Sequence, residues 1–146
     1  MTPIHVVIGT ALIVVNAFAA VWGGWQWRQG RPAPGFWPAL RAGQVLVALE
    51  AVDGGILVLQ GKELPNLHLI YGLVPLAVSF VAEQLRLVAA DQVLDQRGLE
   101  GRADVERLAP EEQAELVQAI LRREMGVMAA SAGVVALLGI RAAGLL

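Results

Sequence analysis

Four long apolar segments dominate this chain of 146 residues and constrain its fold more than any other feature. A helix that crosses the hydrocarbon core of a bilayer needs about 20 mostly apolar residues, and four segments reach that length. Backbone groups in hydrocarbon must be bonded within their own segment, so these segments are predicted to be helices. The period-2 alternation of a membrane β-barrel is absent. The predicted spans cover residues 3–25, 37–60, 65–89 and 125–146.

The composition agrees with a bilayer as the solvent. Hydrophobic residues make up 56% of the chain and charged residues 16%, whereas soluble domains average about 45–50% and about 25%. The formal net charge of −2 gives no reason to expect nucleic-acid binding. The absence of cysteine excludes disulfides, thiolate metal sites, iron–sulfur clusters and covalently attached c-type heme.

The connections between the spans set the predicted topology. Gly and Pro residues break the chain at 29–35 and again at 61–65, and such short turns place consecutive helices side by side. We therefore predict an all-α, single transmembrane domain over residues 1–146, folded as an antiparallel four-helix bundle. Residues 90–124 are polar, and from Pro110 they are expected to form a helix that continues unbroken into the fourth span. This segment is interpreted as a solvated cytoplasmic extension, with a docking surface as the alternative.

The arginines predict an orientation in the membrane. Cytoplasmic loops carry an excess of basic residues, and here the arginines gather in the first and third connections. Both termini are therefore expected outside a multi-pass protein of the inner (plasma) membrane. Four tryptophans cluster near the predicted inner boundary and are interpreted as interfacial anchors: Trp22, Trp25, Trp27 and Trp37.

Two histidines are the most informative polar residues within the predicted spans. His5 follows Pro3 at the start of the first span, and His68 follows Pro65 at the start of the third. Both spans run inward, so the two side chains are expected at the same depth near the outer face. Two imidazoles that face each other in a helix bundle are able to ligate both axial positions of a heme iron. Histidines near helix ends are also often interfacial residues without a ligand, and that alternative stays open.

Further polar residues lie within the predicted spans, where each carries a free-energy cost. Glu50 and Asp53 are three residues apart on one helix face, and Arg141 is their expected partner. A structural ion pair, a proton relay and a hydrogen bond to a ligated histidine are the alternatives for these acids. Arg141 alternatively faces a heme propionate, and Tyr71 is assigned to the same cofactor site. Asn16 and Gln44, finally, are expected to bond neighbouring helices together.

The stretch from Gln44 to His68 resembles one half-repeat of the heme A synthase family. Members of that family have a Gln- and Gly-containing span, a short Leu-Pro turn and then a helix with a heme-ligating histidine, which corresponds here to Leu64-Pro65 and His68. His5, followed by Gly9, stands where the family has its other ligating histidine. The resemblance covers spans one to three and implies heme b binding by His5 and His68.

The departures from that family limit what the resemblance implies. The family has two such halves, and this chain has one. Thr2 and Val6 occupy the places of a glutamate and an arginine that the catalytic half carries beside its first histidine, which argues against heme oxygenation. The segment from Leu67 to Gly72 also resembles a Leu-His-x-x-Tyr-Gly signature of small actinobacterial four-helix membrane proteins.

Three functions remain after these observations. The first is a cytochrome-like protein that binds heme b for electron transfer, heme handling or sensing. The second is a non-catalytic accessory subunit of a membrane complex, with a partner or a second copy of the chain as its neighbour in the bilayer. The third is a small proton-coupled transporter or channel. No catalytic residue is assigned, because no nucleophile with an adjacent base and no phosphate-binding loop is visible.

Overall fold

The computed structural model describes residues 2–31, 33–62 and 65–145, and within these ranges it is entirely helical. Its long helices are α1 (Pro3–Gln29), α2 (Phe36–Leu59), α3 (Asn66–Gln96) and α5 (Pro110–Ala142), and α4 (Arg102–Glu106) is a short fifth helix. No strand occurs among the described residues. All four long helices are long and apolar enough to cross a membrane. The predictions of an all-α fold and of four candidate spans are therefore confirmed.

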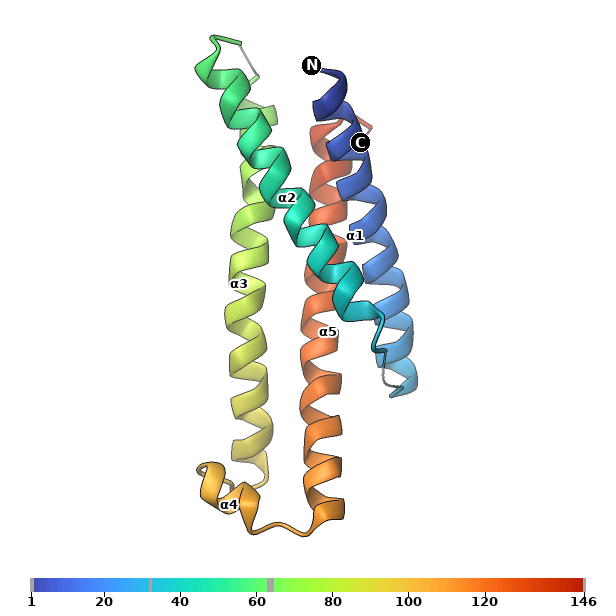
Figure 1. Ribbon diagram of the computed structural model, residues 1–146, viewed down its shortest axis with the longest axis vertical. Helices are drawn as coiled ribbons and strands as arrows, with labels where there is room; N and C mark the ends of the chain where they lie inside the picture. Colours follow the sequence, from blue (N-terminus) through green and yellow to red (C-terminus); the bar gives the residue numbers. More distant parts are fainter. Residues whose placement is uncertain (1, 32, 63–64, 146) are drawn as a thin grey trace.

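The helices form a bundle in which α5 is the central element. It packs along both α1 and α3, while α2 packs mainly against α1. The chain runs down α1, returns along α2, runs down α3 and returns along α5, so that both termini lie at one end and α4 lies at the other (Figure 1). We refer to these as the terminal end and the α4 end of the molecule.

Local chemistry fixes the helix boundaries. The Thr2 hydroxyl oxygen accepts a hydrogen bond of 3.3 Å from the His5 backbone N–H, and Pro3 occupies the first turn of α1, where no N–H is needed. Gly30 ends α1 with a φ of 65°, and Gly61 follows α2 with a φ of 77°. Both are left-handed conformations that favour glycine. Residues 63 and 64 of the second predicted turn lie outside the described part of the chain.

The long helices α3 and α5 extend the bundle at the α4 end. The sequence predicts that α3 continues past residue 89, and it reaches Gln96. As predicted, α5 begins at Pro110 and runs without a break through the fourth span. It ends at Ala142, before Gly144 with its φ of 73°, rather than at the last residues of the chain. The short helix α4 was not predicted, because five residues carry no clear periodicity.

Apolar side chains cover the outside of the bundle as well as its interior. Val7, Val21 and Phe80 are 67%, 75% and 68% exposed. A water-soluble protein rarely exposes so many large apolar side chains along the whole length of its helices. Their exposure here is typical of helices that are surrounded by lipid. The interior holds many small side chains and a few large ones, among them Phe36 and Met128, which are fully buried.

An apolar layer separates the two ends of the bundle. Leu12 of α1, Val47 of α2 and Val135 of α5 pack together and are 4%, 1% and 2% exposed. Asn16 lies beside this layer, against Gly43 of α2, and its amide donates a hydrogen bond of 2.9 Å to the Leu12 carbonyl oxygen. This bond stays within α1, so Asn16 contributes close packing between helices rather than the predicted bond between them.

Candidate functional site

A buried histidine between two carboxylates marks the terminal end of the bundle. His5 of α1 is only 5% exposed. Its Nδ1 lies 3.0 Å from Asp53 Oδ2, and its Nε2 lies 3.2 Å from Glu50 Oε1. The carboxylates come from successive turns of α2, because residues three apart lie on one helix face. Together with His68, these three residues form what we call the terminal-end cluster.

Glycines make room for this contact between α1 and α2. A methyl group in place of the Gly9 hydrogen would lie 2.9 Å from Glu50 Oε1, closer than such atoms normally approach. At Gly54 the corresponding atom would lie 3.9 Å from His5 Cε1, which is ordinary contact. Gly9 therefore allows Glu50 to lie against α1, one turn below His5.

The two contacts of His5 define how many hydrogens the cluster holds. A neutral imidazole carries one N–H donor and one lone pair, and an ionised carboxylate only accepts. Two short N···O contacts on one ring therefore need two hydrogens. Either His5 is a cation between two carboxylates, or it is neutral and one carboxyl group carries the second hydrogen. Removal of one proton leaves a nitrogen lone pair facing a carboxylate oxygen, and that contact is repulsive.

The second oxygen of Glu50 bears on where the proton resides. Glu50 Oε2 is buried and has no hydrogen-bond partner among the described residues. A buried ionised carboxylate with an unpaired oxygen costs more free energy than a neutral carboxyl group. This favours the arrangement in which Glu50 shares its hydrogen with His5 Nε2 while Asp53 accepts from Nδ1. Asp53, whose side chain is 23% exposed, is the member of this pair closer to solvent.

His68 of α3 completes the terminal-end cluster. Its ring centroid lies 5.7 Å from that of His5, with 51° between the ring planes. The structure thus places the two histidines together, as their matched depth predicted. His68 Nδ1 lies 3.1 Å from the Ala142 carbonyl oxygen at the end of α5. A carbonyl oxygen only accepts, so Nδ1 carries the hydrogen and Nε2 of a neutral His68 keeps its lone pair.

Arg141 and Tyr71 lie at the same end of the bundle. The Arg141 guanidinium carbon is 5.6 Å from the centroid of the Tyr71 ring, a cation–π distance. Arg141 was the predicted partner of Glu50 and Asp53, and the structure shows that His5 contacts both carboxylates. The sequence feature that could have indicated the contact with His5 is its predicted depth, which matches that of the carboxylates of α2.

A heme held between two axial histidines would require a change in the arrangement around His5. Nε2 of His68 is available as a ligand, but both ring nitrogens of His5 are directed at carboxylates of α2. Ligation of an iron by His5 would require its ring to leave at least one of these carboxylates.

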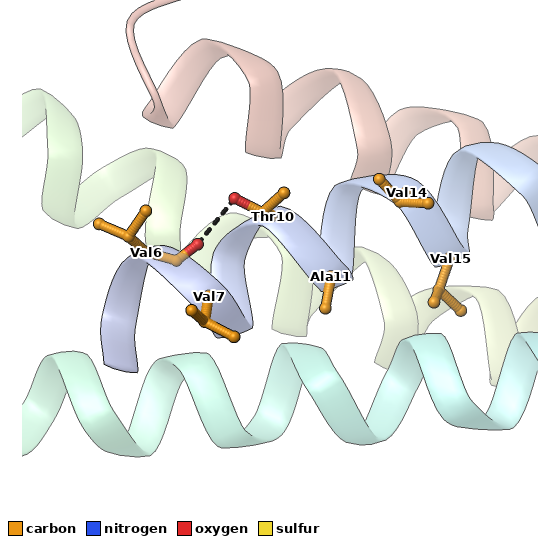
Figure 2. Close-up of a pocket in the computed structure, with 6 residues that line it drawn as sticks. All are labelled: Val6, Val7, Thr10, Ala11, Val14 and Val15. Atoms are coloured by element: carbon orange, nitrogen blue, oxygen red, sulfur yellow. Dashed lines mark hydrogen bonds between the residues drawn. The ribbon is translucent and has the colours of Figure 1, made fainter. Parts of the chain in front are cut away.

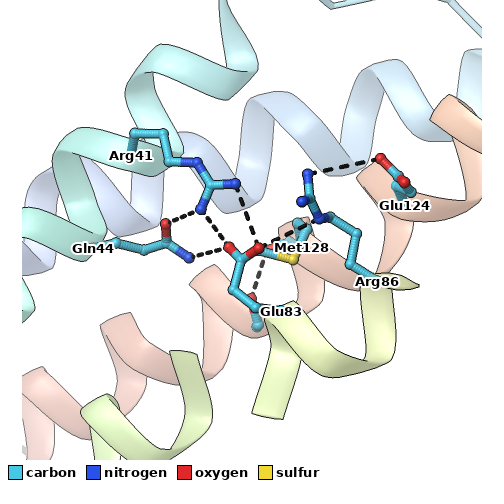
Figure 3. A network of polar contacts seen from close by, with 7 residues as sticks. Arg41, Gln44, Glu83, Arg86, Glu124 and Met128 are labelled. Atoms are coloured by element: carbon cyan, nitrogen blue, oxygen red, sulfur yellow. Dashed lines mark hydrogen bonds and ion pairs between the residues drawn. The ribbon is translucent and has the colours of Figure 1, made fainter. Parts of the chain in front are cut away.

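A second polar network lies toward the α4 end of the membrane spans, and Figure 3 shows it. Glu83 of α3 pairs with Arg41 of α2 and accepts a hydrogen bond of 2.8 Å from Gln44. Arg86 Nε lies 3.3 Å from Glu83 Oε2, and its Nη1 lies 3.9 Å from Glu124 of α5. We call these five residues the arginine network. It includes the predicted bond of Gln44 between helices.

The arginine network was not predicted from the sequence, because Arg41 and Glu83 are 42 positions apart. Only the packing of α2 on α3 brings them together. Arg86 also lies 5.7 Å from the centroid of the Trp37 ring, which ties the network to the predicted tryptophan belt. The two arginines and two glutamates balance in charge, so the network in its ionised form carries no net charge.

A groove on the outside of α1 carries no reactive groups. Its single hydroxyl, that of Thr10, is already bonded to the Val6 carbonyl oxygen at 2.7 Å (Figure 2). All other lining side chains are apolar, so the groove suits lipid chains rather than a polar ligand. The lining residues are Val6, Val7, Thr10, Ala11, Val14 and Val15.

Comparison of the chain with protein-family models, with characterised proteins and with solved structures gives no match. The terminal-end cluster is therefore interpreted from its own chemistry.

Proposed function

We propose that this protein binds and releases a proton at the terminal-end cluster, as the proton site of a small proton-coupled membrane transporter. The observation that carries the proposal is the buried His5 ring with a carboxylate at each nitrogen. Chains of Asp, Glu and His within membrane spans commonly serve as proton relays. In this proposal the helices are antiparallel, both termini face outward and residues 90–124 are cytoplasmic, in line with the distribution of arginines.

The position of the cluster supports exchange of protons with one side of the membrane. Asp53 is partly exposed at the terminal end, so it connects the cluster to the outer surface. Toward the other side, the buried layer of Leu12, Val47 and Val135 offers no polar group to carry a proton onward. This arrangement corresponds to a carrier in its outward-facing state and not to an open channel.

Loss of the proton would change the packing of α1 against α2. With both hydrogens present, His5 holds α2 through two contacts; with one hydrogen removed, one contact becomes repulsive. The protonation state of the cluster thereby biases the separation of the two helices at the terminal end. A carrier needs such a link between proton occupancy and helix packing to couple proton movement to conformational change.

The proposal is tested by infrared difference spectroscopy of the protein in lipid vesicles during a pH titration. The expected result is a carbonyl stretch of a protonated carboxyl group that disappears as the pH is raised and is absent in Glu50→Gln. The Glu83→Gln variant is the matched control, because Glu83 pairs with permanently charged arginines, and it should keep the band. An unchanged band in Glu50→Gln together with Asp53→Asn would refute the proton site.

Heme b binding is the second candidate, and the orientation of His68 favours it. The Ala142 carbonyl fixes the hydrogen of His68 on Nδ1 and leaves Nε2 as a potential ligand, as is common for metal-bound histidines. His5 would have to turn away from α2 to provide a second ligand. An absorption spectrum of the protein expressed with ample heme tests this function. A Soret band that is lost in His68→Ala supports it, and a colourless protein argues against it.

A further inference from the structure

The hairpin formed by α3 and α5 extends beyond the other two long helices at the α4 end (Figure 1). At this level α1 has ended, since Gly30, the first residue after it, lies beside the Arg122 side chain of α5. We call residues 87–121 the protruding hairpin. Inside the bundle, α1 and α2 cover one face of α5 and one face of α3. In the protruding hairpin the same two faces are not covered by these helices.

The α5 side of this uncovered face is apolar. Met125 is 4% exposed and belongs to the interior cluster that also contains Ala19 of α1 and Phe36 of α2. Leu121 and Val117 precede it by four and eight residues and therefore lie on the same face of the helix. They are 40% and 51% exposed. The apolar face of α5 that is buried in the bundle thus continues for two more turns, where its side chains are exposed.

The α3 side combines an apolar residue with acids. Glu83 contacts Arg41 of α2, so the face of α3 that it occupies points toward α2. Leu87 lies one turn beyond Glu83 on that face and is 55% exposed. Asp91 and Asp95 follow on α3 and are both exposed, on the side of the helix that faces away from the buried Ala89 and Val93. Leu87, Val117 and Leu121 are the exposed apolar side chains of these two faces, and we call this apolar surface the hairpin groove.

The charge of the protruding hairpin selects among the groups that would cover this groove. It carries eight acidic residues against three arginines, a net charge of −5. A second copy of the chain would bring an equally acidic hairpin, and an anionic membrane surface would repel it. A helix with apolar side chains on one face and basic side chains on the other complements both the apolar residues and the net negative charge of the protruding hairpin.

We propose that the hairpin groove docks a basic amphipathic helix of a partner protein at the membrane surface. The fourth predicted span begins directly after Glu124. At 1.5 Å per residue along α5, Val117 lies about 10 Å from Glu124 and Leu121 lies about 4.5 Å from it. The groove therefore spans the layer in which basic amphipathic helices settle beside a membrane. The inference is independent of proton binding at the terminal-end cluster, since it involves different residues at the opposite end.

The test uses the full-length protein in nanodiscs of zwitterionic lipid, which remove electrostatic attraction of the probe to the bilayer. The probe is a fluorescent amphipathic peptide of leucine and lysine, and binding is measured by anisotropy. We expect at least about tenfold weaker binding to the triple variant Leu87→Ser, Val117→Ser, Leu121→Ser. Val88→Ser is the matched control: Val88 is 49% exposed but lies outside the groove, so the affinity should not change.

Two further peptides separate the groove from unspecific attraction. A peptide of the same composition in scrambled order, without an apolar face, and a leucine–glutamate peptide should both bind at least about tenfold more weakly. Equal binding of either peptide, or equal binding to the triple variant, would overturn the proposal.

Photocrosslinking from position 117 in native membranes provides a second measurement. A crosslink to a basic amphipathic segment of another protein supports the proposal, and a crosslink to a second copy or to lipid alone contradicts it. The single variant Val117→Ser serves if the triple variant does not fold.

Discussion

The two polar sites of the molecule, the terminal-end cluster and the arginine network, both tie α2 to its neighbours but are built from different chemistry. At the terminal end, a histidine joins the two carboxylates of α2 to α1. Toward the α4 end, guanidinium groups join a glutamate of α3 to α2. Arginine stays charged at every accessible pH, whereas the charge of histidine changes near neutrality.

The arginine network holds the bundle together, whereas the terminal-end cluster is able to respond to pH. The guanidinium groups of the arginine network keep their charge, so the network anchors α2 and α3 at every pH at which its glutamates are ionised. The terminal-end cluster has two short contacts that depend on two hydrogens, so its cohesion depends on proton supply. One end of α2 is thus fixed while the other end is adjustable.

The largest expected effect comes from His5→Phe, which removes the partner of two carboxylates. Loss of one partner from a buried ion pair costs about 3 kcal/mol, and both acids here are mostly buried. We expect the free energy of unfolding in detergent to fall by about that amount. His68→Phe, which loses the hydrogen bond to Ala142 but keeps an aromatic ring beside His5, is the control and should lose about 1 kcal/mol. Equal losses would mean that the carboxylates do not depend on His5.

The second effect is a pH dependence of the free energy of unfolding that originates at the terminal end of the molecule. The contacts of His5 are complete when two hydrogens are present, so their contribution is present at low pH and is lost as the pH rises. A hydrogen bond to a charged group contributes about 2 kcal/mol, which sets the expected loss. Unfolding curves measured between acidic and alkaline pH check this, and the slope should vanish in His5→Phe. A slope that survives in that variant places the titrating group elsewhere.

A smaller effect is expected from Glu83→Gln in the arginine network. The variant removes two ion pairs that are partly exposed, and each such pair contributes about 0.5 kcal/mol. The total loss of about 1 kcal/mol should be constant from neutral to alkaline pH, where Glu83 is ionised, in contrast to the terminal-end cluster. Parallel stability–pH curves for Glu83→Gln and the unmodified protein over this range would support the comparison, and converging curves would break it.

The smallest effect distinguishes two glycines of α1. In the interior of a helix, alanine is more favourable than glycine by about 1 kcal/mol. Gly24→Ala should realise this gain, since nothing lies within 4 Å of the added methyl group. Gly9→Ala should not, because its methyl group pushes against Glu50 and disturbs the terminal-end cluster. Thermal unfolding of both variants side by side measures the difference, and an equal gain in both would show that Glu50 has room to move.

Much of the fold follows from sequence because the bilayer leaves few alternatives. Long apolar segments in hydrocarbon must be helical, and the four segments of this chain appear as α1, α2, α3 and α5. Pro3 and Pro65 fix where two of the spans begin, so the equal depth of His5 and His68 was readable as well. Depth is determined by position along a helix, which the sequence gives directly.

The sequence does not determine which faces of the helices meet. Glu50 and Asp53 share their depth with both His5 and Arg141, and only the packing of α1 against α2 selects His5 as the contact of both. Likewise, no local pattern connects Arg41 with Glu83. These pairings depend on the rotation of each helix about its axis, which is set by small residues such as Gly9 and Gly43 at the contacts.

The continuous helix α5 joins the two ends of the molecule mechanically. Its 33 residues span about 50 Å at 1.5 Å per residue, with no break between Pro110 and Ala142. At one end the Ala142 carbonyl binds His68, and at the other end Val117 and Leu121 form part of the hairpin groove. A rod of this length that tilts by about 5° about one end displaces its other end by about 4 Å. A small tilt of α5 caused by movement of the histidines would therefore move the binding surface at the α4 end of the molecule.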